Sequence, residues 1–356
     1  MGVPFFFILG RPRSGTTLLK TLFDAHPNVM IPSELPVFLP LYQKFKGVKT
    51  WDQVQIRSFV EHVFQPNVFN HRRVENLRID KEKLMADLLK LERNCSIQDL
   101  LIQFNAHAFS PFPKEEILLV GDKNPVYSVY TKRLLSIFPE ARFICIVRDY
   151  RDNFVSLRNL KEVKLEAPVI TLQIARWKLI TKMFIAYQKK FPGRFRVIRY
   201  EDLVTQPRDT FRGLCEFLGI PYCEAVFSFH ERKDEILEMF ANPAIEKIHQ
   251  SLLNPVNVSR MNLWMTALTD REIRMADQIA GTTADTMGYP RANTRFSPGL
   301  WLRSLPMAIY SRLLFTLMVA ASKLPYSLSR RIALSLPLLV KFYSVLARLT
   351  STPGHP

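Results

Sequence analysis

The stretch from Phe5 to Leu22, FFFILGRPRSGTTLLKTL, constrains the fold more than any other part of the chain. Its first residues form an apolar run that predicts a buried strand, and its last residues have the apolar spacing of a helix. The loop between them contains Gly10 and Gly15. Such a loop can direct backbone N–H groups and the positive end of a helix dipole at one anion, because glycine lets the backbone approach closely. The sequence therefore predicts a phosphate-binding loop.

The spacing of the glycines matches the nucleoside-triphosphate loop G-x-x-x-x-G-K-[ST], with Thr17 in the last place, but Thr16 stands where the lysine belongs. That lysine reaches the β- and γ-phosphates of a triphosphate, so its absence favours a shorter anion. Arg11 and Arg13 supply positive charge to the loop. The alternative is a strand–turn–helix in which the glycines and threonines are incidental.

The segment RPRSGTTLLKTLFDAHPNV resembles the 5′-phosphosulfate loop of sulfotransferases that use 3′-phosphoadenosine 5′-phosphosulfate, particularly the branch of tyrosylprotein and carbohydrate sulfotransferases. The resemblance implies an α/β fold with a P-loop-type parallel sheet flanked by helices. It also implies that 3′-phosphoadenosine 5′-phosphosulfate is the co-substrate. The loop residues expected to contact it are Arg11, Arg13, Ser14, Gly15, Thr16, Thr17 and Leu18.

A second anion site is predicted in the middle of the chain. The apolar run RFICIV predicts a strand over 142–147, and RDYRDNFVSLRNL follows it directly. Arg148 leaves the end of that strand, and Ser156 lies on the next predicted helix. The pattern resembles the sulfotransferase motif V-R-D-x-R-x-x-x-x-S, which implies that these two residues bind the 3′-phosphate. A solvated cluster of ion pairs is the alternative, and Arg151 with Asp152 can serve as an ion pair or a helix cap.

Two further residues are candidates for the chemistry itself. Glu34 lies in an extended segment between two prolines, and Lys123 follows an apolar run, 117–120, that predicts a buried strand. The resemblance implies that Glu34 takes the proton of the acceptor, and that Lys123 and Arg13 stabilise the charge on the departing phosphate. The alternatives are a solvated carboxylate and a turn lysine.

The remaining cofactor contacts come from later segments. Tyr200 is the last residue of a predicted strand, 194–200, and resembles a family residue near the adenine, although an interior tyrosine fits the pattern as well. The segment NPVNVSRMNLW, 254–264, resembles a late loop that returns over the cofactor, and it supplies Ser259 and Arg260. Helices are predicted over 124–138 and 169–191, from 201 to a cap at Gly219, and over 269–289.

The resemblance spans most of residues 3–290. We therefore expect a sulfotransferase domain over 1–295, a helical insertion over 37–115 on the acceptor side, and a basic, apolar helical tail over 296–356. The four cysteines have neither C-x-x-C spacing nor a metal pattern, so they predict reduced, buried thiols. The chain begins without a basic segment followed by a long apolar one, and a cytoplasmic location is expected.

The net charge of +17 is unevenly distributed, because no acidic residue follows Asp285 while nine basic residues do. No nucleic-acid-binding signature accompanies them, so we expect no nucleic-acid partner. The longest uncharged run of the tail, 313–322, is too short to cross a bilayer. Arg330, Lys341 and Arg348 fall on one side of a helix, which favours contact with an anionic membrane surface. Packing on the main domain and a homodimer interface remain alternatives.

The predicted function is transfer of a sulfuryl group from 3′-phosphoadenosine 5′-phosphosulfate to an acceptor hydroxyl or amine. Fixed cations oppose the developing charge in this mechanism, so no metal is expected. A P-loop nucleotide kinase is one alternative, and it requires a lysine in place of Thr16 together with a magnesium-binding aspartate. A non-catalytic nucleotide-binding protein at a membrane surface is another. The acceptor is open among tyrosine, glycan, lipid and small-molecule hydroxyls.

Overall fold

The computed structural model describes residues 3–65, 74–91, 95–160, 168–238, 250–325 and 327–328. Contacts divide the chain into two compact units. The first unit combines Met1–Arg148 with Phe184–Arg260, and the second combines Asp149–Met183 with Met261–Pro356. Arg330, Lys341 and Arg348 of the tail lie outside the described residues.

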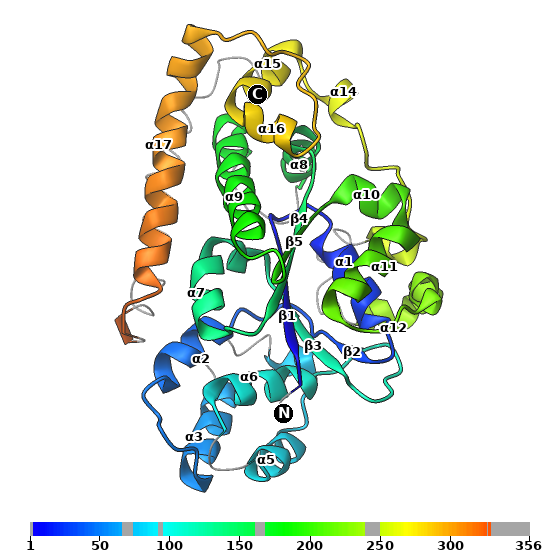
Figure 1. Cartoon of the computed structure of the whole chain (residues 1–356), viewed down its shortest axis with the longest axis vertical. Helices are drawn as coiled ribbons and strands as arrows, with labels where there is room; N and C mark the ends of the chain where they lie inside the picture. The colour runs from blue at the N-terminus through cyan, green and yellow to red at the C-terminus, as the bar shows by residue number, and fades with distance from the viewer. Residues whose placement is uncertain are drawn as a thin grey trace. The chain divides into compact units, whose positions relative to one another are not determined.

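A five-stranded parallel sheet forms the centre of the first unit (Figure 1). Its order is β2-β3-β1-β4-β5, with β1 in the centre, and the predicted parallel sheet is confirmed. Every residue of β1 is buried, as expected for a strand covered on both faces. The strands are β1 (Phe5–Gly10), β2 (Val29–Met30), β3 (Leu119–Lys123), β4 (Arg142–Val147) and β5 (Phe195–Arg199).

Alternating phenylalanines of β1 anchor the two helical layers, because successive strand side chains point to opposite faces. Phe6 packs against Phe23 of α1 (Thr16–Asp24) on one face. Phe5 and Phe7 pack against Phe38 of α2 (Phe38–Phe45) on the other face. Because both faces of β1 are occupied by large aromatic side chains, its position and that of the loop after Gly10 are strongly specified.

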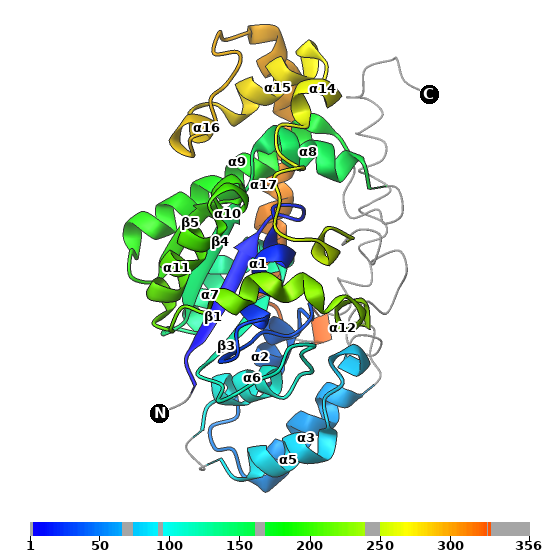
Figure 2. The ribbon, with the colours of Figure 1, turned by 90° about the vertical axis from the view of Figure 1, so that its right-hand side faces the viewer.

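The predicted insertion contains four α-helices among its described residues (Figure 2). Three of them begin with a side-chain N-cap, from Asp52, Asp80 and Ser96 respectively. In addition to α2, the elements are α3 (Gln53–Phe64), the short 3-10 helix η1 (Glu75–Leu77), α5 (Lys81–Leu89) and α6 (Ile97–Ala106). These helices pack on one another, and α6 also contacts β3.

Later helices complete both units. In the first unit they are η2 (Pro125–Tyr130), α7 (Thr131–Ile137), α10 (Tyr200–Thr205), α11 (Pro207–Leu218), η3 (Glu224–Glu231), α12 (Lys233–Glu238) and η4 (Gln250–Leu253). In the second unit they are α8 (Tyr150–Arg158), α14 (Trp264–Ala267), α15 (Asp270–Ala280), α16 (Thr282–Thr286) and α17 (Pro298–Ala321). The helix α9 (Ile170–Lys190) passes from the second unit into the first.

Three predicted helices are interrupted. The helix expected over 124–138 begins as the 3-10 helix η2 and becomes α-helical at Thr131. The helix expected to reach Gly219 is divided at Gln206, because a residue before a proline is disfavoured in helical conformation. The helix expected over 269–289 is divided at Gly281, whose φ is 58°. The predicted cap at Gly219 is confirmed, with a left-handed φ of 71°.

The cysteines are free thiols, as predicted, although only Cys145 and Cys215 are buried. Cys95 and Cys223 are half-exposed, so the prediction that all four are buried is wrong for these two. The predicted strand before Lys123 also begins later than expected and includes the lysine itself. This shift matters for the site, because it makes Lys123 the last residue of a strand rather than part of a turn.

Candidate functional site

The predicted phosphate-binding loop leaves β1 at the carboxyl edge of the sheet. β1 lies between β3 and β4, and all three strands are parallel, so the loops that follow them meet at one edge. Ser128 of η2 fixes the end of β1, because its hydroxyl donates to the Gly10 carbonyl and accepts from the Gly10 amide, each at 3.0 Å. Sequence reasoning did not predict this contribution of Ser128, which lies 118 residues from Gly10.

The loop has the backbone conformation that an anion-binding turn requires. Gly15 has a left-handed φ of 91° and forms the N-cap of α1. A Cβ added at Gly15 would collide with the ring of Tyr200, so glycine is needed for steric as well as conformational reasons. Arg13 also has a positive φ, 68°, which is uncommon for a residue other than glycine. This conformation is typical of functional loops.

Three predicted cofactor residues converge beside this loop within the first unit. Arg148 donates to the carbonyl of Arg13 at 3.2 Å and to the carbonyl of Arg260. The guanidinium of Arg148 also lies 4.8 Å from the ring centre of Tyr200. Burial, followed by the charges of Arg260 and Arg148, lowers the pKa of Arg13 to about 10. The two predicted anion sites therefore share one basic cluster, which we define as Arg13, Arg148 and Arg260.

The two candidate catalytic residues form an ion pair. The ammonium of Lys123 donates to the carboxylate of Glu34 and, at 3.1 Å, to the hydroxyl of Thr17. The side chain of Lys123 is 3% exposed, whereas that of Glu34 is 41% exposed. Lys123 is therefore held at the base of the loop, and Glu34 remains accessible to a molecule that arrives from solvent.

A buried carboxyl group, that of Asp122, comes directly before Lys123 in β3. Asp122 accepts hydrogen bonds from Asn124 at 2.5 Å and from Asn105 of α6 at 3.3 Å. Burial raises the pKa of Asp122 to about 7, and the nearby charge of Glu34 adds to the increase. The DKxP segment of the family resemblance includes Asp122, but sequence reasoning gave it no role, because the contact with Asn105 joins two separate segments.

A second buried charge centre lies at the end of α1. Asp24 accepts from Lys20 at 2.7 Å and from Ser110 at 2.9 Å, and its backbone carbonyl accepts from Lys114. Burial lowers the pKa of Lys20, although the charge of Asp24 opposes this effect. The ammonium of Lys114 meets the free carbonyls at the end of the helix, where positive charge is favourable. These contacts hold α1 in place.

The other predicted contacts fall into different environments. Arg11, Ser14 and Thr16 are buried. Ser259 is exposed and donates from its hydroxyl to Asn257 within the same loop. Ser156 lies on α8 in the second unit, so its assignment to the 3′-phosphate stays a prediction.

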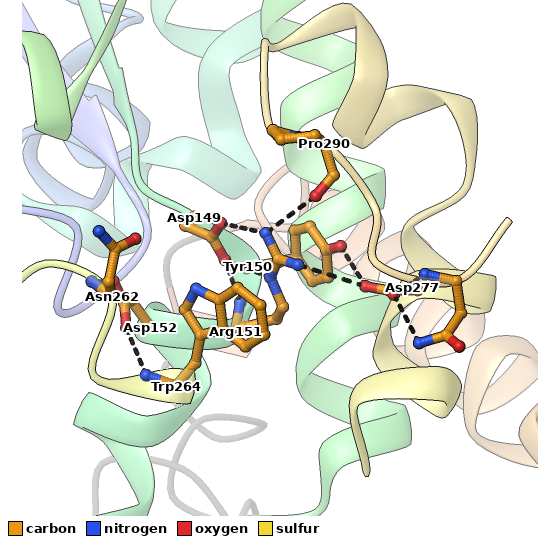
Figure 3. A network of polar contacts seen from close by, with 9 residues as sticks. Asp149, Tyr150, Arg151, Asp152, Asn262, Trp264, Asp277 and Pro290 are labelled. Atoms are coloured by element: carbon orange, nitrogen blue, oxygen red, sulfur yellow. Dashed lines mark hydrogen bonds and ion pairs between the residues drawn. The ribbon is translucent and has the colours of Figure 1, made fainter. Parts of the chain in front are cut away.

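Arg151 is the centre of a polar network in the second unit (Figure 3). It donates to both carboxylate oxygens of Asp149, at 3.1 and 2.7 Å, and lies 3.6 Å from a carboxylate oxygen of Asp277. Its guanidinium also stacks 3.8 Å from the ring centre of Trp264. Of the two roles left open by the sequence, the structure therefore shows an ion pair for Arg151.

Asp152 has the other role and caps backbone groups. Its carboxylate accepts from the amides of Asn262 at 2.7 Å and Trp264 at 3.0 Å (Figure 3). Asn262 has a positive φ of 58°, so the chain turns sharply there. Asp152 is thus a positioning residue for the carboxyl-terminal end of the segment 254–264.

The fold and the site define a class of protein. A model of the sulfotransferase family matches residues 4–224, which is more than half of the chain, and the chain therefore belongs to this family. The match includes the loop after β1, the Glu34–Lys123 pair and the segment that contains Arg148 and Tyr200. The resemblance inferred from the loop motif is confirmed at the level of the family.

Named relatives belong to the tyrosylprotein branch. The chain is 25% identical over 295 residues to "Protein-tyrosine sulfotransferase" of Drosophila melanogaster. The match covers 82% of this chain and 53% of the relative. It is also 25% identical over 297 residues to "Protein-tyrosine sulfotransferase 1" of Danio rerio, with 82% and 74% covered. The chain therefore spans about half the length of the fly relative and about three quarters of the fish relative.

Solved structures share the fold. A sulfotransferase domain from the curacin biosynthetic pathway superposes with a TM-score of 0.50 and 21% identity, over 82% of this chain and 99% of that chain. A sulfotransferase domain from the Synechococcus PCC 7002 olefin synthase gives a TM-score of 0.52 and 20% identity, over 82% and 97%. At these identities the comparison shows the architecture alone.

Proposed function

We propose that the protein transfers the sulfuryl group of 3′-phosphoadenosine 5′-phosphosulfate to an acceptor hydroxyl. The observation that carries this proposal is the adjacency of Lys123, Thr17 and Glu34 at the end of the strand–loop–helix unit. A buried cation and an accessible carboxylate are the two groups that sulfuryl transfer to a hydroxyl requires. The family assignment and the basic cluster support the same donor.

The residues have distinct roles in this mechanism. The acceptor oxygen attacks sulfur, the bond between sulfur and the 5′-phosphate oxygen breaks, and Glu34 takes the acceptor proton. Negative charge grows on the leaving 5′-phosphate, where Lys123 and Arg13 oppose it. The backbone of the loop, with Ser14, Thr16 and Thr17, holds the 5′ end, and Arg148 holds the 3′-phosphate, for which the contribution of Ser156 stays a prediction. Tyr200, Ser259 and Arg260 complete the nucleotide contacts.

A tyrosine hydroxyl is the first acceptor to test, because the named relatives are protein-tyrosine sulfotransferases. Glycan, lipid and small-molecule hydroxyls remain in the test set. The proposed acceptor side is the helical insertion over 37–115. A cytoplasmic location, a homodimer and a metal-free reaction stay predictions; in the part of the chain that the structure describes, no three histidine, cysteine or acidic side chains gather as a metal site would need.

Two measurements test the proposal. Calorimetry should detect binding of adenosine 3′,5′-bisphosphate and much weaker binding of ATP with magnesium. Transfer of labelled sulfate to tyrosine peptides should fall by about 10²–10⁴-fold in Glu34→Gln, because the general base is lost, while the bisphosphate still binds. Lys123→Ala should reduce turnover by about 10²–10³-fold.

Glu140→Gln is the matched control, because Glu140 is an exposed glutamate in the same unit, just before β4 and outside both the proposed site and the insertion. Its turnover should equal that of the wild type. Binding of the bisphosphate without transfer to any acceptor would favour the non-catalytic alternative. Tight binding of ATP with magnesium and no binding of the bisphosphate would refute the proposed donor.

A further inference from the structure

The helix α17 differs from the other helices in what it exposes. It is continuous from Pro298 to Ala321, and Pro306 lies within it. At 1.5 Å per residue its 24 residues extend about 36 Å. Among the described residues it is the one helix that is long and apolar enough to cross a membrane. A core helix can meet the same criteria, so burial must separate the two cases.

Burial shows that α17 is not a core helix. Only 17% of its most apolar 18-residue window is buried. The buried residues Ser304, Met307 and Ser311 lie on one side, and α17 contacts α15 within the second unit. At about 100° per residue the opposite side carries a continuous apolar stripe. We define this exposed stripe as Leu302, Pro306, Ile309, Leu313, Leu317 and Ala320.

Positive charge flanks the stripe on both sides. Arg303 and Arg312 lie about 80–100° to either side of the line through Leu302, Ile309 and Leu313, when successive residues are separated by about 100°. Both arginines are exposed. The chain has no acidic residue after Asp285, so no carboxylate of this segment compensates them. An apolar stripe with cations along its two edges is the arrangement of a helix that lies in a bilayer interface.

We propose that the exposed stripe of α17 binds the surface of an anionic lipid bilayer. The stripe enters the boundary between headgroups and acyl chains, and the two arginines extend sideways to lipid phosphates. A transverse orientation is unfavourable, because Arg312, near the middle of the helix, would lie within the hydrocarbon. In the surface orientation the leucines contact acyl chains and the arginines contact lipid phosphates. This proposal does not depend on the proposed catalytic activity.

The full-length protein can be tested by flotation with phosphatidylcholine vesicles, with and without phosphatidylserine. We expect the wild type to float with the anionic vesicles. Ile309→Glu with Leu313→Glu should weaken this partitioning at least about tenfold, because two apolar side chains that would enter the bilayer are lost. Arg303→Gln with Arg312→Gln should reduce it about fivefold for each arginine and abolish the preference for anionic lipid.

The matched control is Val54→Glu with Leu118→Glu, since both residues are exposed apolar side chains of the first unit. This variant should partition like the wild type, and all variants should bind adenosine 3′,5′-bisphosphate equally if they are folded. Wild-type protein that stays with the soluble fraction overturns the proposal. So does flotation of the Ile309→Glu, Leu313→Glu variant at the wild-type level. Conversion of a lipid-free dimer to a monomer by that variant would instead assign the stripe to contact between two copies.

Discussion

The basic cluster of the first unit and the network around Arg151 in the second contain similar residues in opposite electrostatic states. In the basic cluster of the first unit, burial and then the like charges of Arg260 and Arg148 lower the pKa of Arg13 to about 10. In the second unit, burial also acts against Arg151, but the hydrogen bond and charge of Asp149 overcome it and raise the pKa of Arg151. The charged form is disfavoured in the first case and favoured in the second.

This contrast separates a proposed binding residue from a structural one within a single short segment. Arg148 and Arg151 are three residues apart, yet the first joins a group of like charges and the second is enclosed by carboxylates. A group of like charges gains free energy when an anion arrives, whereas a fully paired arginine gains little. The first cluster is therefore suited to a phosphorylated ligand, and the second holds the fold together.

The largest effect expected from this contrast is on stability. Arg151→Met should lower the free energy of unfolding by about 3–5 kcal/mol, because Asp149 and Asp277 would be left buried without their partner. Urea unfolding measures this difference. Arg212→Met is the control, since Arg212 pairs with Asp209 at the surface and its loss should cost less than about 1 kcal/mol. Equal costs for the two variants would remove the structural assignment of Arg151.

A smaller effect should appear as a dependence on pH in the first unit. The pKa of Asp122 is raised to about 7 by burial, from an ordinary value of 3.8. Between these values the folded protein holds a proton that the unfolded chain has lost, so the wild type loses stability as the pH rises. Asp122→Asn removes this titration. Its stability relative to the wild type should therefore increase by about 2 kcal/mol between about pH 5 and pH 6.5.

The measurement is urea unfolding of both proteins at several pH values, with attention to the change in their difference rather than its absolute size. The lost or altered hydrogen bonds to Asn105 and Asn124 contribute an offset that is independent of pH. A difference that stays constant across the window would show that the environment of Asp122 accommodates its charge. The surroundings of Asp122 would then stabilise a buried charge, as those of Arg151 do in the second unit.

Sequence reasoning succeeded where local pattern determines structure. The apolar runs predicted β1 and β4, and the loop glycines predicted the sharp turn before α1, where Gly15 has a left-handed φ. The proximity of two members of the basic cluster could also be predicted, because Arg13 and Arg148 each follow a parallel strand. Parallel strands end at one edge of a sheet, so residues after them come together without any further signal.

The same reasoning failed where contacts join distant segments or where a helix must be divided. Asn105 contacts Asp122, 17 residues away in the sequence, and Ser128 contacts Gly10, 118 residues away. No periodicity encodes such pairs. The division at Gly281 was missed because the apolar spacing continues beyond it. The network around Arg151 was ambiguous for a related reason, since its partner Asp277 is far away in the sequence.

An intermediate effect is expected where a structural residue holds part of the proposed binding loop. Asp152→Asn leaves one carbonyl oxygen for two amide donors, so the backbone of Asn262 or Trp264 loses its acceptor. We expect a loss of about 1–2 kcal/mol in unfolding free energy. Arg260 lies two residues before Asn262, so affinity for adenosine 3′,5′-bisphosphate should also fall severalfold in calorimetry. Unchanged affinity together with lower stability would show that Asp152 stabilises the fold and does not contribute to ligand binding.

The smallest expected effect on stability is the most discriminating one. Arg13→Met should change the free energy of unfolding by less than about 1 kcal/mol, because removal of one of three like charges offsets the contacts that are lost. Affinity for adenosine 3′,5′-bisphosphate should nevertheless fall by about tenfold or more, since a charge-assisted contact to the 5′-phosphate is lost. Arg212→Met should leave this affinity unchanged. Arg13→Met should thus lower the affinity for the ligand without lowering the stability of the fold, whereas Arg151→Met should lower that stability. If Arg13→Met destabilised the protein as much as Arg151→Met does, the basic cluster would be a structural element and the contrast between the two centres would fail.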